Sequence, residues 1–425
     1  MVKEIQPSGP LQGVFTVPGS KSITNRALAC AALAKGESLV RNASDSDDTA
    51  LMANGLNQLG VLVRKTANGL VVHGTDAVLT APKFPIPAGN AGTTLRFLMS
   101  LSALAKGHVV IEGSARMAER PNEDLLEALR TLGVPVMHKN QTARFEIDGG
   151  SMRGGTVHVK GSKSSQFVSS ILLAAPYAGA SITIEVDGPL ASSTYVDITL
   201  AVMASFGVTA ERIRENVFRV EKGQRYQKAD YRVEADASGA AYGFGAAAIT
   251  GGEVTVTGLR IDSFQGDIGF VELLRRMGCA VEDTAPGVRV VRAAALRGID
   301  VEMNVMPDVV PTLAAVALFA EGKTRIRNVA HLRHKESDRL RALTEELTRL
   351  GASVTEMDDG LEITPVPLHG ATLDPRSDHR LAMSFALVGL RIPGVTVRNP
   401  ECVTKSFPGF WSEIERLRRP AGIRV

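Results

Sequence analysis

Cysteine and aromatic side chains are scarce in this chain of 425 residues. The three cysteines, Cys30, Cys279 and Cys402, are too few for a disulfide framework, and their spacing fits no metal motif. Aromatic residues make up 5% of the chain, which argues against a surface that stacks single-stranded nucleic acid on exposed rings. No apolar run approaches the roughly 18 residues of a membrane span. We therefore expect a cytoplasmic protein in a reducing compartment, without a membrane segment.

The chain also lacks a large excess of positive or negative charge. The chain has 48 basic and 45 acidic residues, a net charge of +3, which does not favour wholesale nucleic-acid binding. The opening MVKEIQPSG lacks the apolar core of a secretory signal. The sequence has no G-x-x-x-x-G-K-[ST] loop and no G-x-G-x-x-G turn, and no histidine has a partner at metal-ligand spacing. We expect neither a nucleotide cofactor nor a metal.

What the chain does contain is a repeat of about 72 residues. Six stretches each read as the end of an Ala/Leu-rich helix, a glycine and an alternating strand, with the glycines at Gly36, Gly107, Gly179, Gly252, Gly322 and Gly394. A second series has helix-ending glycines, where positive φ is needed, at Gly60, Gly133, Gly207, Gly278, Gly351 and Gly422. Two interleaved series predict one strand–helix–strand–helix–strand–strand unit in six copies. An ordinary α/β protein with regular spacing is the alternative.

Six copies divide naturally into three and three. The sixth copy reaches Val425 without a final strand, whereas the N-terminal segments KEIQPS and GVFTV are strand-like and unassigned. We expect the N-terminal segment to complete the last copy. Residues 16–231 would then form one domain, and residues 1–15 with 232–425 a discontinuous second domain.

The most polar and glycine-rich stretches fall at the predicted helix N-termini. Free backbone N–H groups and a partial positive charge make such helix ends anion sites. Cations concentrate there as well: Lys21, Arg26, Arg96, Arg116, Arg120, Lys163, Lys335, Arg339, Arg380 and Lys405. Clusters of this kind predict a ligand with several phosphates and carboxylates. The alternative is that the hydroxyls only cap helices and the cations are only solvated.

Two carboxylates and a lysine are the candidates for chemistry. Asp308 in NVMPDVVPT is flanked by apolar residues, Glu336 in HKESDR lies between basic residues, and Lys21 belongs to GSKS. Such a set suits proton transfer at carbon or oxygen without a covalent intermediate. Cys402, near Lys405, is a remote candidate for a nucleophile.

Ten ordered motifs carry a resemblance to a known family. They are PGSKSITNRAL, GNAGTTLRFL, RMAERP, GSKSSQF, YVDITL, EADASGAAY, MPDVVPT, HKESDRL, SDHRLAM and TKSFPGF. With them the chain resembles the 5-enolpyruvylshikimate-3-phosphate (EPSP) synthase family nearly end to end. The resemblance implies an α/β fold of two inside-out, barrel-like domains, each of three βαβαββ repeats, with substrates in an inter-domain cleft.

The resemblance also implies a reaction. The 5-hydroxyl of shikimate 3-phosphate attacks C2 of phosphoenolpyruvate, C3 is protonated, and phosphate is then eliminated from the tetrahedral adduct. This is the sixth step of the shikimate route to the aromatic amino acids, and it needs no metal or organic cofactor. Glyphosate is expected to compete with phosphoenolpyruvate, because Gly92 leaves room for it. A monomer is our default expectation.

Matched motif by motif, the resemblance also implies the contacts of each substrate. Those of shikimate 3-phosphate are Lys21, Ser22, Arg26, Ser164, Ser165, Gln166, Ser192, Tyr195, Asp308, His331 and Lys335. Those of phosphoenolpyruvate are Lys21, Asn90, Gly92, Arg96, Arg120, Gln166, Lys335, Arg339, Arg380 and Lys405. Asp308 matches the base facing the 5-hydroxyl, Glu336 the acid that handles the proton near C3, and Lys21 also reaches the reacting centre.

Two other interpretations stay open at this point. The UDP-N-acetylglucosamine enolpyruvyl transferases share the fold and the donor, but their hallmark is a mobile-loop cysteine in the N-terminal half. Here Cys30 is the only cysteine before residue 279, and it falls in a predicted helix. A phosphate-binding protein without catalysis, namely an anion sensor or an RNA-phosphate binder on the same repeat scaffold, would not need Asp308 and Glu336. Phosphate release from shikimate 3-phosphate and phosphoenolpyruvate separates all three.

Overall fold

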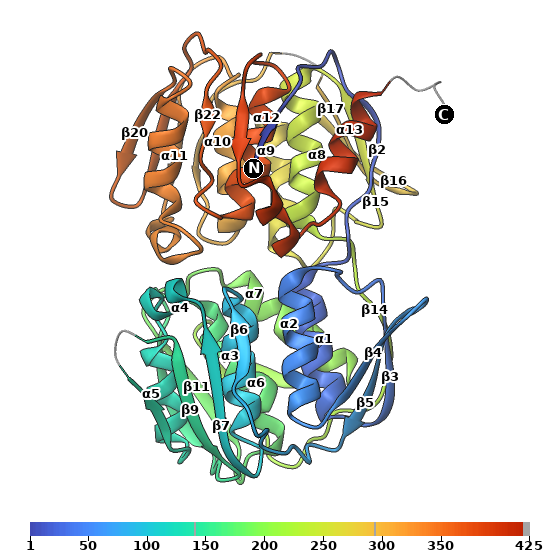
Figure 1. Ribbon diagram of the computed structural model, residues 1–425, viewed down its shortest axis with the longest axis vertical. Coiled ribbons are helices and arrows are strands. Elements are labelled where there is room, and N and C mark those ends of the chain that lie inside the picture. The colour runs from blue at the N-terminus through green and yellow to red at the C-terminus, as the bar shows by residue number, and fades with distance from the viewer. Residues whose placement is uncertain (140–141, 293–294, 420–425) are drawn as a thin grey trace. The chain divides into compact units, whose positions relative to one another are not determined.

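The computed structural model describes residues 1–139, 142–292 and 295–419 (Figure 1). The chain divides into two compact units. Gly19–Glu234 form one, called here the middle unit, and Met1–Pro18 together with Ala235–Val425 form the other, called the terminal unit. Each is a mixed α/β structure built from three sheets.

The middle unit contains three four-stranded sheets of one pattern. In each sheet the first two strands are parallel, and the other two neighbouring pairs are antiparallel. The strand orders are β14 (Asp230–Arg232), β3 (Lys35–Arg41), β5 (Gly69–Thr75), β4 (Leu62–Thr66); β6 (Ile86–Gly89), β7 (Gly107–Gly113), β9 (Arg144–Gly149), β8 (Val136–His138); and β10 (Gly155–Lys160), β11 (Ile182–Asp187), β13 (Val217–Val220), β12 (Ala210–Arg214).

The terminal unit repeats the pattern. Its orders are β2 (Gln12–Phe15), β15 (Glu253–Thr257), β17 (Gly287–Arg292), β16 (Cys279–Thr284); β18 (Asp300–Glu302), β19 (Thr324–Arg327), β21 (Gly360–Thr364), β20 (Ser353–Met357); and β22 (Thr372–Leu373), β23 (Thr396–Arg398), β1 (Val2–Glu4). Over the described residues none of the six sheets closes into a barrel. Over the described residues the six-copy repeat predicted from glycine spacing is therefore confirmed: five sheets have four strands, and the sixth has three strands with the same parallel first pair followed by an antiparallel pair.

Two first strands are exchanged between copies that are far apart in sequence. β2 precedes the first repeat's helix in the chain but pairs in parallel with β15 of the fourth repeat, whereas β14 precedes the fourth repeat's helix but pairs with β3 of the first. β1 pairs with β23 and completes the sixth sheet. The prediction that the N-terminal segment completes the last copy is thus correct for VKE, while QGVF completes the fourth copy (Figure 1).

The first helix of each repeat lies in the core of its unit. These helices are α1 (Lys21–Leu33), α3 (Gly92–Ser102), α6 (Ser165–Ala174), α8 (Ala237–Thr250), α10 (Val310–Ala317) and α12 (His379–Gly389). Every residue of α3, α8, α10 and α12 is buried, as expected of helices without a polar face. α8 is rich in alanine and glycine, and a Cβ on Gly245 would lie 3.0 Å from Leu387 of α12. Small side chains therefore allow these helices to pack closely.

The second helices are α2 (Asp47–Gln58), α5 (Glu123–Thr131), α7 (Thr194–Ser205), α9 (Phe270–Arg276), α11 (Arg339–Thr348) and α13 (Phe410–Arg418), and the short α4 (Ala115–Glu119) precedes α5. Both series of predicted helix starts are therefore found. The predicted left-handed glycines of the second series are confirmed for the five described positions, with Gly351 at φ 87° as an example; Gly422 lies outside the described residues. Within the described part of the chain, no helix has the length and hydropathy to span a membrane.

Candidate active site

Lys21 stands at the first position of α1 and forms an ion pair with Asp48. Its Nζ lies 2.8 Å from Asp48 Oδ2, and the two side chains are only 12% and 4% exposed. Asp48 belongs to the first turn of α2, where a carboxylate is favoured by the helix dipole. The pair therefore holds the Lys21 ammonium at the start of α1. Asp48 was not among the predicted site residues, although it lies in SDSDDT at a predicted helix start.

Arg26 is held by oxygens of three helices. It is 1% exposed and donates to the carbonyl of Ser22 at 2.8 Å, to Thr199 Oγ1 at 2.7 Å, to the carbonyl of Tyr195 at 3.0 Å and to Ser169 Oγ at 3.3 Å. These acceptors are neutral, and burial lowers the pKa of Arg26 to about 10. Arg26 still carries its charge at neutral pH, next to the main chain of Ser22 and Tyr195.

A second chain of polar contacts joins α3 to α6. Arg96 donates to Gln166 Oε1 at 2.5 Å and to Asn122 Oδ1 at 3.1 Å, and Gln166 donates to Thr93 Oγ1 at 3.0 Å. Ser164 caps α6 by accepting from the backbone N–H of Gln166. The predicted residues Arg96, Ser164 and Gln166 are therefore brought together at the N-termini of α3 and α6.

Gly92 is the first residue of α3, and the guanidinium of Arg120 packs against it. A Cβ at position 92 would lie 2.8–2.9 Å from three atoms of that guanidinium. Asn90 precedes α3 by two residues, and Arg120 is 6% exposed. Glycine is thus required here for the observed position of Arg120.

The other predicted residues of the middle unit also lie at helix starts. Ser165 is the first residue of α6, and Ser192, with φ 59°, stands two residues before α7. Two cations of the predicted clusters are engaged elsewhere: Lys163 Nζ lies 2.8 Å from Asp124 Oδ2, and Arg116 pairs with Glu119.

The terminal unit holds the second group of predicted residues around the carboxylate of Asp308. Arg380 donates to Asp308 Oδ2 at 2.6 Å and Arg339 donates to Oδ1 at 3.0 Å. Lys335 Nζ lies 4.0 Å from the same Oδ1. Asp308 is in the short 3₁₀ turn η3 (Pro307–Val309) before α10, so three chain segments converge on it.

Arg339 connects Asp308 to the second candidate carboxylate. It donates to Glu336 Oε2 at 2.9 Å, and Lys405 Nζ lies 4.0 Å from Glu336 Oε1. The side chain of Glu336 is 10% exposed. Asp308 and Glu336 are therefore bridged by a single guanidinium, and each has a lysine 4.0 Å from one of its oxygens.

Asp378 orients this cluster and was missed from sequence. It is fully buried, accepts from Arg339 Nε at 2.8 Å and from Ser337 Oγ at 3.1 Å, and caps α12 by accepting from the backbone N–H of Arg380 at 3.0 Å. One carboxylate thus fixes the side chain of Arg339 and the start of the helix that carries Arg380. Its position in SDHRLAM, at a predicted helix start, was the available signal.

The surrounding charges act strongly on proton affinities. Burial by itself would raise the pKa of Asp308, but Arg380, Lys335 and Arg339 hold it well below its usual value. Burial and the neighbouring Lys335 lower the pKa of His331 to about 3. At neutral pH Asp308 is therefore anionic and His331 is uncharged.

One further buried carboxylate adjoins this cluster. Asp267, in η2 (Gly266–Gly269), accepts a short hydrogen bond from Ser238 Oγ. Burial and the charge of Asp308 raise the pKa of Asp267 to about 6. Within the described residues, no group of three or more His, Cys, Asp or Glu side chains could hold a metal ion.

Comparison with known proteins identifies the family of this chain. The model of the EPSP synthase (3-phosphoshikimate 1-carboxyvinyltransferase) family matches residues 5–414. The chain belongs to the EPSP synthase family. A 3-phosphoshikimate 1-carboxyvinyltransferase of Methanoculleus marisnigri is 45% identical over 416 residues, 97% of this chain and 99% of the relative. That of Trichormus variabilis is 40% identical, over 96% of this chain and 97% of the relative.

The structures agree with the sequences. The EPSP synthase of Acinetobacter baumannii has a TM-score of 0.83 and 28% identity, covering 98% of both chains. The EPSP synthase fold inferred from the ten motifs is therefore confirmed, and the chain is a transferase of the shikimate pathway. Its family membership also excludes the interpretation as a phosphate-binding protein without catalysis.

Proposed function

We propose that this chain transfers the 1-carboxyvinyl group of phosphoenolpyruvate to the 5-hydroxyl of shikimate 3-phosphate, and that the two residue clusters described above carry the reaction. The observation that supports these roles best is the Asp308 carboxylate, which contacts two guanidiniums and lies one guanidinium away from Glu336. A general base and a general acid surrounded by cations suit proton transfer on anionic substrates.

We assign the middle unit to shikimate 3-phosphate. Lys21, Ser22, Ser164, Ser165 and Ser192 offer an ammonium and hydroxyls beside helix N-termini, which is the chemistry that phosphate and carboxylate groups need. Arg26 and Tyr195 are joined by a hydrogen bond at the start of α7. His331 is uncharged at neutral pH, so its proposed contact with this substrate is a neutral hydrogen bond.

We assign phosphoenolpyruvate to the guanidiniums and lysines of both clusters, together with the amides of Asn90 and Gln166 and the backbone at Gly92. The residues are Lys21, Asn90, Gly92, Arg96, Arg120, Gln166, Lys335, Arg339, Arg380 and Lys405. The two substrates together carry two phosphates and two carboxylates, roughly five negative charges near neutral pH. The cations named here offset that charge.

The proposed chemistry has two balanced halves. In the addition, the substrate oxygen bonds to C2 of phosphoenolpyruvate while its proton passes to Asp308 and a proton from Glu336 reaches C3. In the elimination, C3 returns a proton to Glu336, the C2–phosphate oxygen bond breaks, and the departing phosphate takes the proton held by Asp308, so that both carboxyl groups regain their starting states. Lys21, oriented by Asp48, lies beside the departing phosphate in this proposal and balances its charge.

Substrate binding should itself strengthen the base. In the structure, Arg380, Arg339 and Lys335 stabilise the anionic form of Asp308 and depress its pKa. A carboxylate with so low a pKa accepts protons poorly. Phosphate and carboxylate groups of the substrates would compete for the same cations, which weakens their hold on Asp308 and raises its proton affinity. Asp308 thus gains basicity when its reactants are present.

Phosphate release is the direct test. The protein is mixed with phosphoenolpyruvate and either shikimate 3-phosphate or UDP-N-acetylglucosamine, and inorganic phosphate is measured. We expect phosphate release when shikimate 3-phosphate is the acceptor and none when UDP-N-acetylglucosamine is the acceptor. Release only with the nucleotide sugar would favour the related transferase instead, and release with neither acceptor would contradict both.

Two finer proposals accompany the reaction. We propose that glyphosate competes with phosphoenolpyruvate, so that rising phosphoenolpyruvate should restore phosphate release; inhibition unaffected by phosphoenolpyruvate would contradict this. We also propose a cytoplasmic monomer. Sedimentation equilibrium should then return the mass of one chain, 45.1 kDa.

A further inference from the structure

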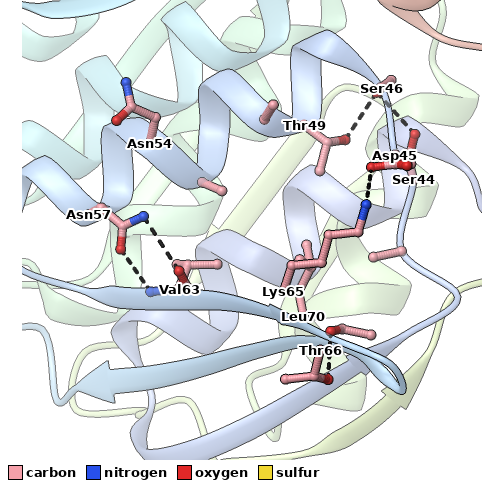
Figure 2. Close-up of a pocket in the computed structure, with 14 residues that line it drawn as sticks. Ser44, Asp45, Ser46, Thr49, Asn54, Asn57, Val63, Lys65, Thr66 and Leu70 are labelled. Atoms are coloured by element: carbon pink, nitrogen blue, oxygen red, sulfur yellow. Dashed lines mark hydrogen bonds and ion pairs between the residues drawn. The ribbon is translucent and has the colours of Figure 1, made fainter. Parts of the chain in front are cut away.

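The middle unit has a groove that none of the proposed substrate contacts lines. It lies between α2 and the β4–β5 hairpin and encloses a cavity of about 340 Å³ (Figure 2). Ligand pockets span about 300–1,000 Å³, so this one suits a small molecule. Its lining residues are Ala43, Ser44, Asp45, Ser46, Thr49, Ala50, Ala53, Asn54, Asn57, Val63, Lys65, Thr66, Gly69 and Leu70.

The groove has one cation and one anion side by side. Figure 2 shows Lys65 extending from the hairpin toward Asp45, and Lys65 Nζ lies 2.6 Å from Asp45 Oδ1. The two side chains are 69% and 75% exposed. An exposed ion pair is worth only about 0–1 kcal/mol. A ligand that offers one charge to each partner can therefore replace this pair at little cost.

The rest of the groove has hydroxyls at one end, the amides of Asn54 and Asn57 at the other and apolar side chains between them (Figure 2). Ser44 Oγ donates to Ser46 Oγ at 3.0 Å, and Ser46 Oγ donates to Thr49 Oγ1 at 3.2 Å. Alanines of α2 and the aliphatic side chains of the hairpin supply the apolar surface, namely Ala50, Ala53, Val63 and Leu70. A bound molecule would thus meet two opposite charges, a short row of hydroxyls and an aliphatic wall.

We propose that this groove binds a zwitterionic α-amino acid with an apolar side chain. The carboxylate pairs with Lys65, the ammonium pairs with Asp45, and the side chain lies against Ala53, Val63 and Leu70. A dianion would be repelled by Asp45, and a polyamine by Lys65. The adjacent opposite charges therefore select a zwitterion.

Ligand binding in the groove should affect Lys21, because a groove residue and the ion-pair partner of Lys21 are neighbours in the first turn of α2. Thr49 lines the groove, and its neighbour Asp48 forms the ion pair with Lys21. A ligand that fixes or shifts this turn changes how Lys21 is held, and such coupling is reciprocal for binding. This consequence rests on the proposed function, whereas binding in the groove does not.

The test measures binding of L-leucine to the whole protein by isothermal titration calorimetry, without substrates. Two analogues each lack one charge: 3-methylbutylamine has no carboxylate, and 4-methylpentanoate has no ammonium. We expect L-leucine to bind and each analogue to bind several-fold more weakly. Lys65→Met and Asp45→Asn should each weaken L-leucine binding by about two- to fivefold, the value of one exposed charge contact. Ala53→Leu, which fills the groove, should abolish it.

Lys323→Met serves as the matched control, since Lys323 forms an exposed pair with Glu362 at 2.7 Å in the terminal unit; it should leave binding unchanged. The proposal is wrong if L-leucine shows no saturable binding up to about 10 mM, because a Kd above that concentration corresponds to a binding free energy of less than about 3 kcal/mol in magnitude. It is equally wrong if either analogue binds as tightly as L-leucine, or if binding survives Ala53→Leu. None of these outcomes bears on phosphate release, so the two proposals fail separately.

Discussion

Replacing His331 with asparagine should change how the stability of the terminal unit depends on pH. The His331 imidazole is 7% exposed, and burial together with Lys335 lowers its pKa from 6.5 to about 3 in the folded protein. Between these values the unfolded chain binds a proton that the folded chain does not. Stability is therefore lost as pH falls below about 6.5, by about 1.4 kcal/mol per pH unit.

At pH 5 the imidazole of His331 is largely protonated in the unfolded chain and neutral in the folded chain. The gap between pH 5 and the unfolded pKa of 6.5 corresponds to about 2 kcal/mol, and this figure holds for any folded-state pKa below about 4. At pH 8 the contribution vanishes because His331 is neutral in both states. The stability of His331→Asn relative to the unmodified protein should thus rise by about 2 kcal/mol from pH 8 to pH 5.

The difference must be measured against the unmodified protein because Asp267 acts in the opposite direction. Its pKa is raised from 3.8 to about 6, so the folded state binds the extra proton and stability increases as pH falls through 6. The two contributions partly cancel in the unmodified protein. Asp267→Asn is the matched control, and its difference curve should slope the other way between pH 4 and 6.

Urea unfolding followed by tryptophan fluorescence provides the assay. The chain has one tryptophan, and Trp411 lies in α13 of the terminal unit, the unit that contains His331. The free energy of unfolding is measured at pH 8, 7, 6 and 5 for each protein. A His331→Asn difference that stays flat, or that falls toward pH 5, would show that His331 is not held neutral in the folded protein.

Three further predictions concern the candidate site. Asp308→Asn should lower turnover by roughly 10²–10⁴-fold, the usual contribution of a general base, with phosphate release as the measurement; normal turnover would remove Asp308 from that role. Gly92→Ala should raise the KM for phosphoenolpyruvate without lowering the unfolding midpoint, because the added Cβ meets Arg120 at 2.8–2.9 Å; an unchanged KM would contradict the assignment. Asp378→Ala should destabilise the terminal unit by roughly 1–3 kcal/mol, because it leaves buried donors of Arg339 and Ser337 without their acceptor while Arg339 keeps Asp308 and Glu336; no loss in urea unfolding would contradict this.

Much of this molecule follows from local sequence patterns. A glycine at Gly351 ends a helix because only a residue without Cβ adopts φ 87° at little cost, and such positions recur with the repeat. Polar residues before a helix mark its N-terminus, and in the structure Ser164 of GSKSSQF and Asp338 of HKESDRL cap α6 and α11. These rules act over a few residues, so the sequence displays them directly.

The partners of the site residues depend on packing across the repeats. Asp48 and Asp378 both occur in polar motifs at helix starts, but nothing local says that they face Lys21 and Arg339 rather than solvent. Likewise, Lys163 looks like part of an anion site, yet it pairs with Asp124 39 residues away. The ion-pair partner of each side chain depends on positions in the folded structure, and local sequence patterns do not predict these positions.

The six-fold repeat, the helix starts that carry the site and, through its motifs, the family can all be predicted from the amino-acid sequence. The sheets that β2 and β14 complete could not be predicted, because strand pairing is non-local and here joins residues more than 190 apart. The tertiary structure also decided the charge state of the cluster. A carboxylate such as Asp308 has a low proton affinity only when folding brings Arg339 and Arg380 within 2.6–3.0 Å of it, since charge interactions depend on distance in space and not on separation along the chain.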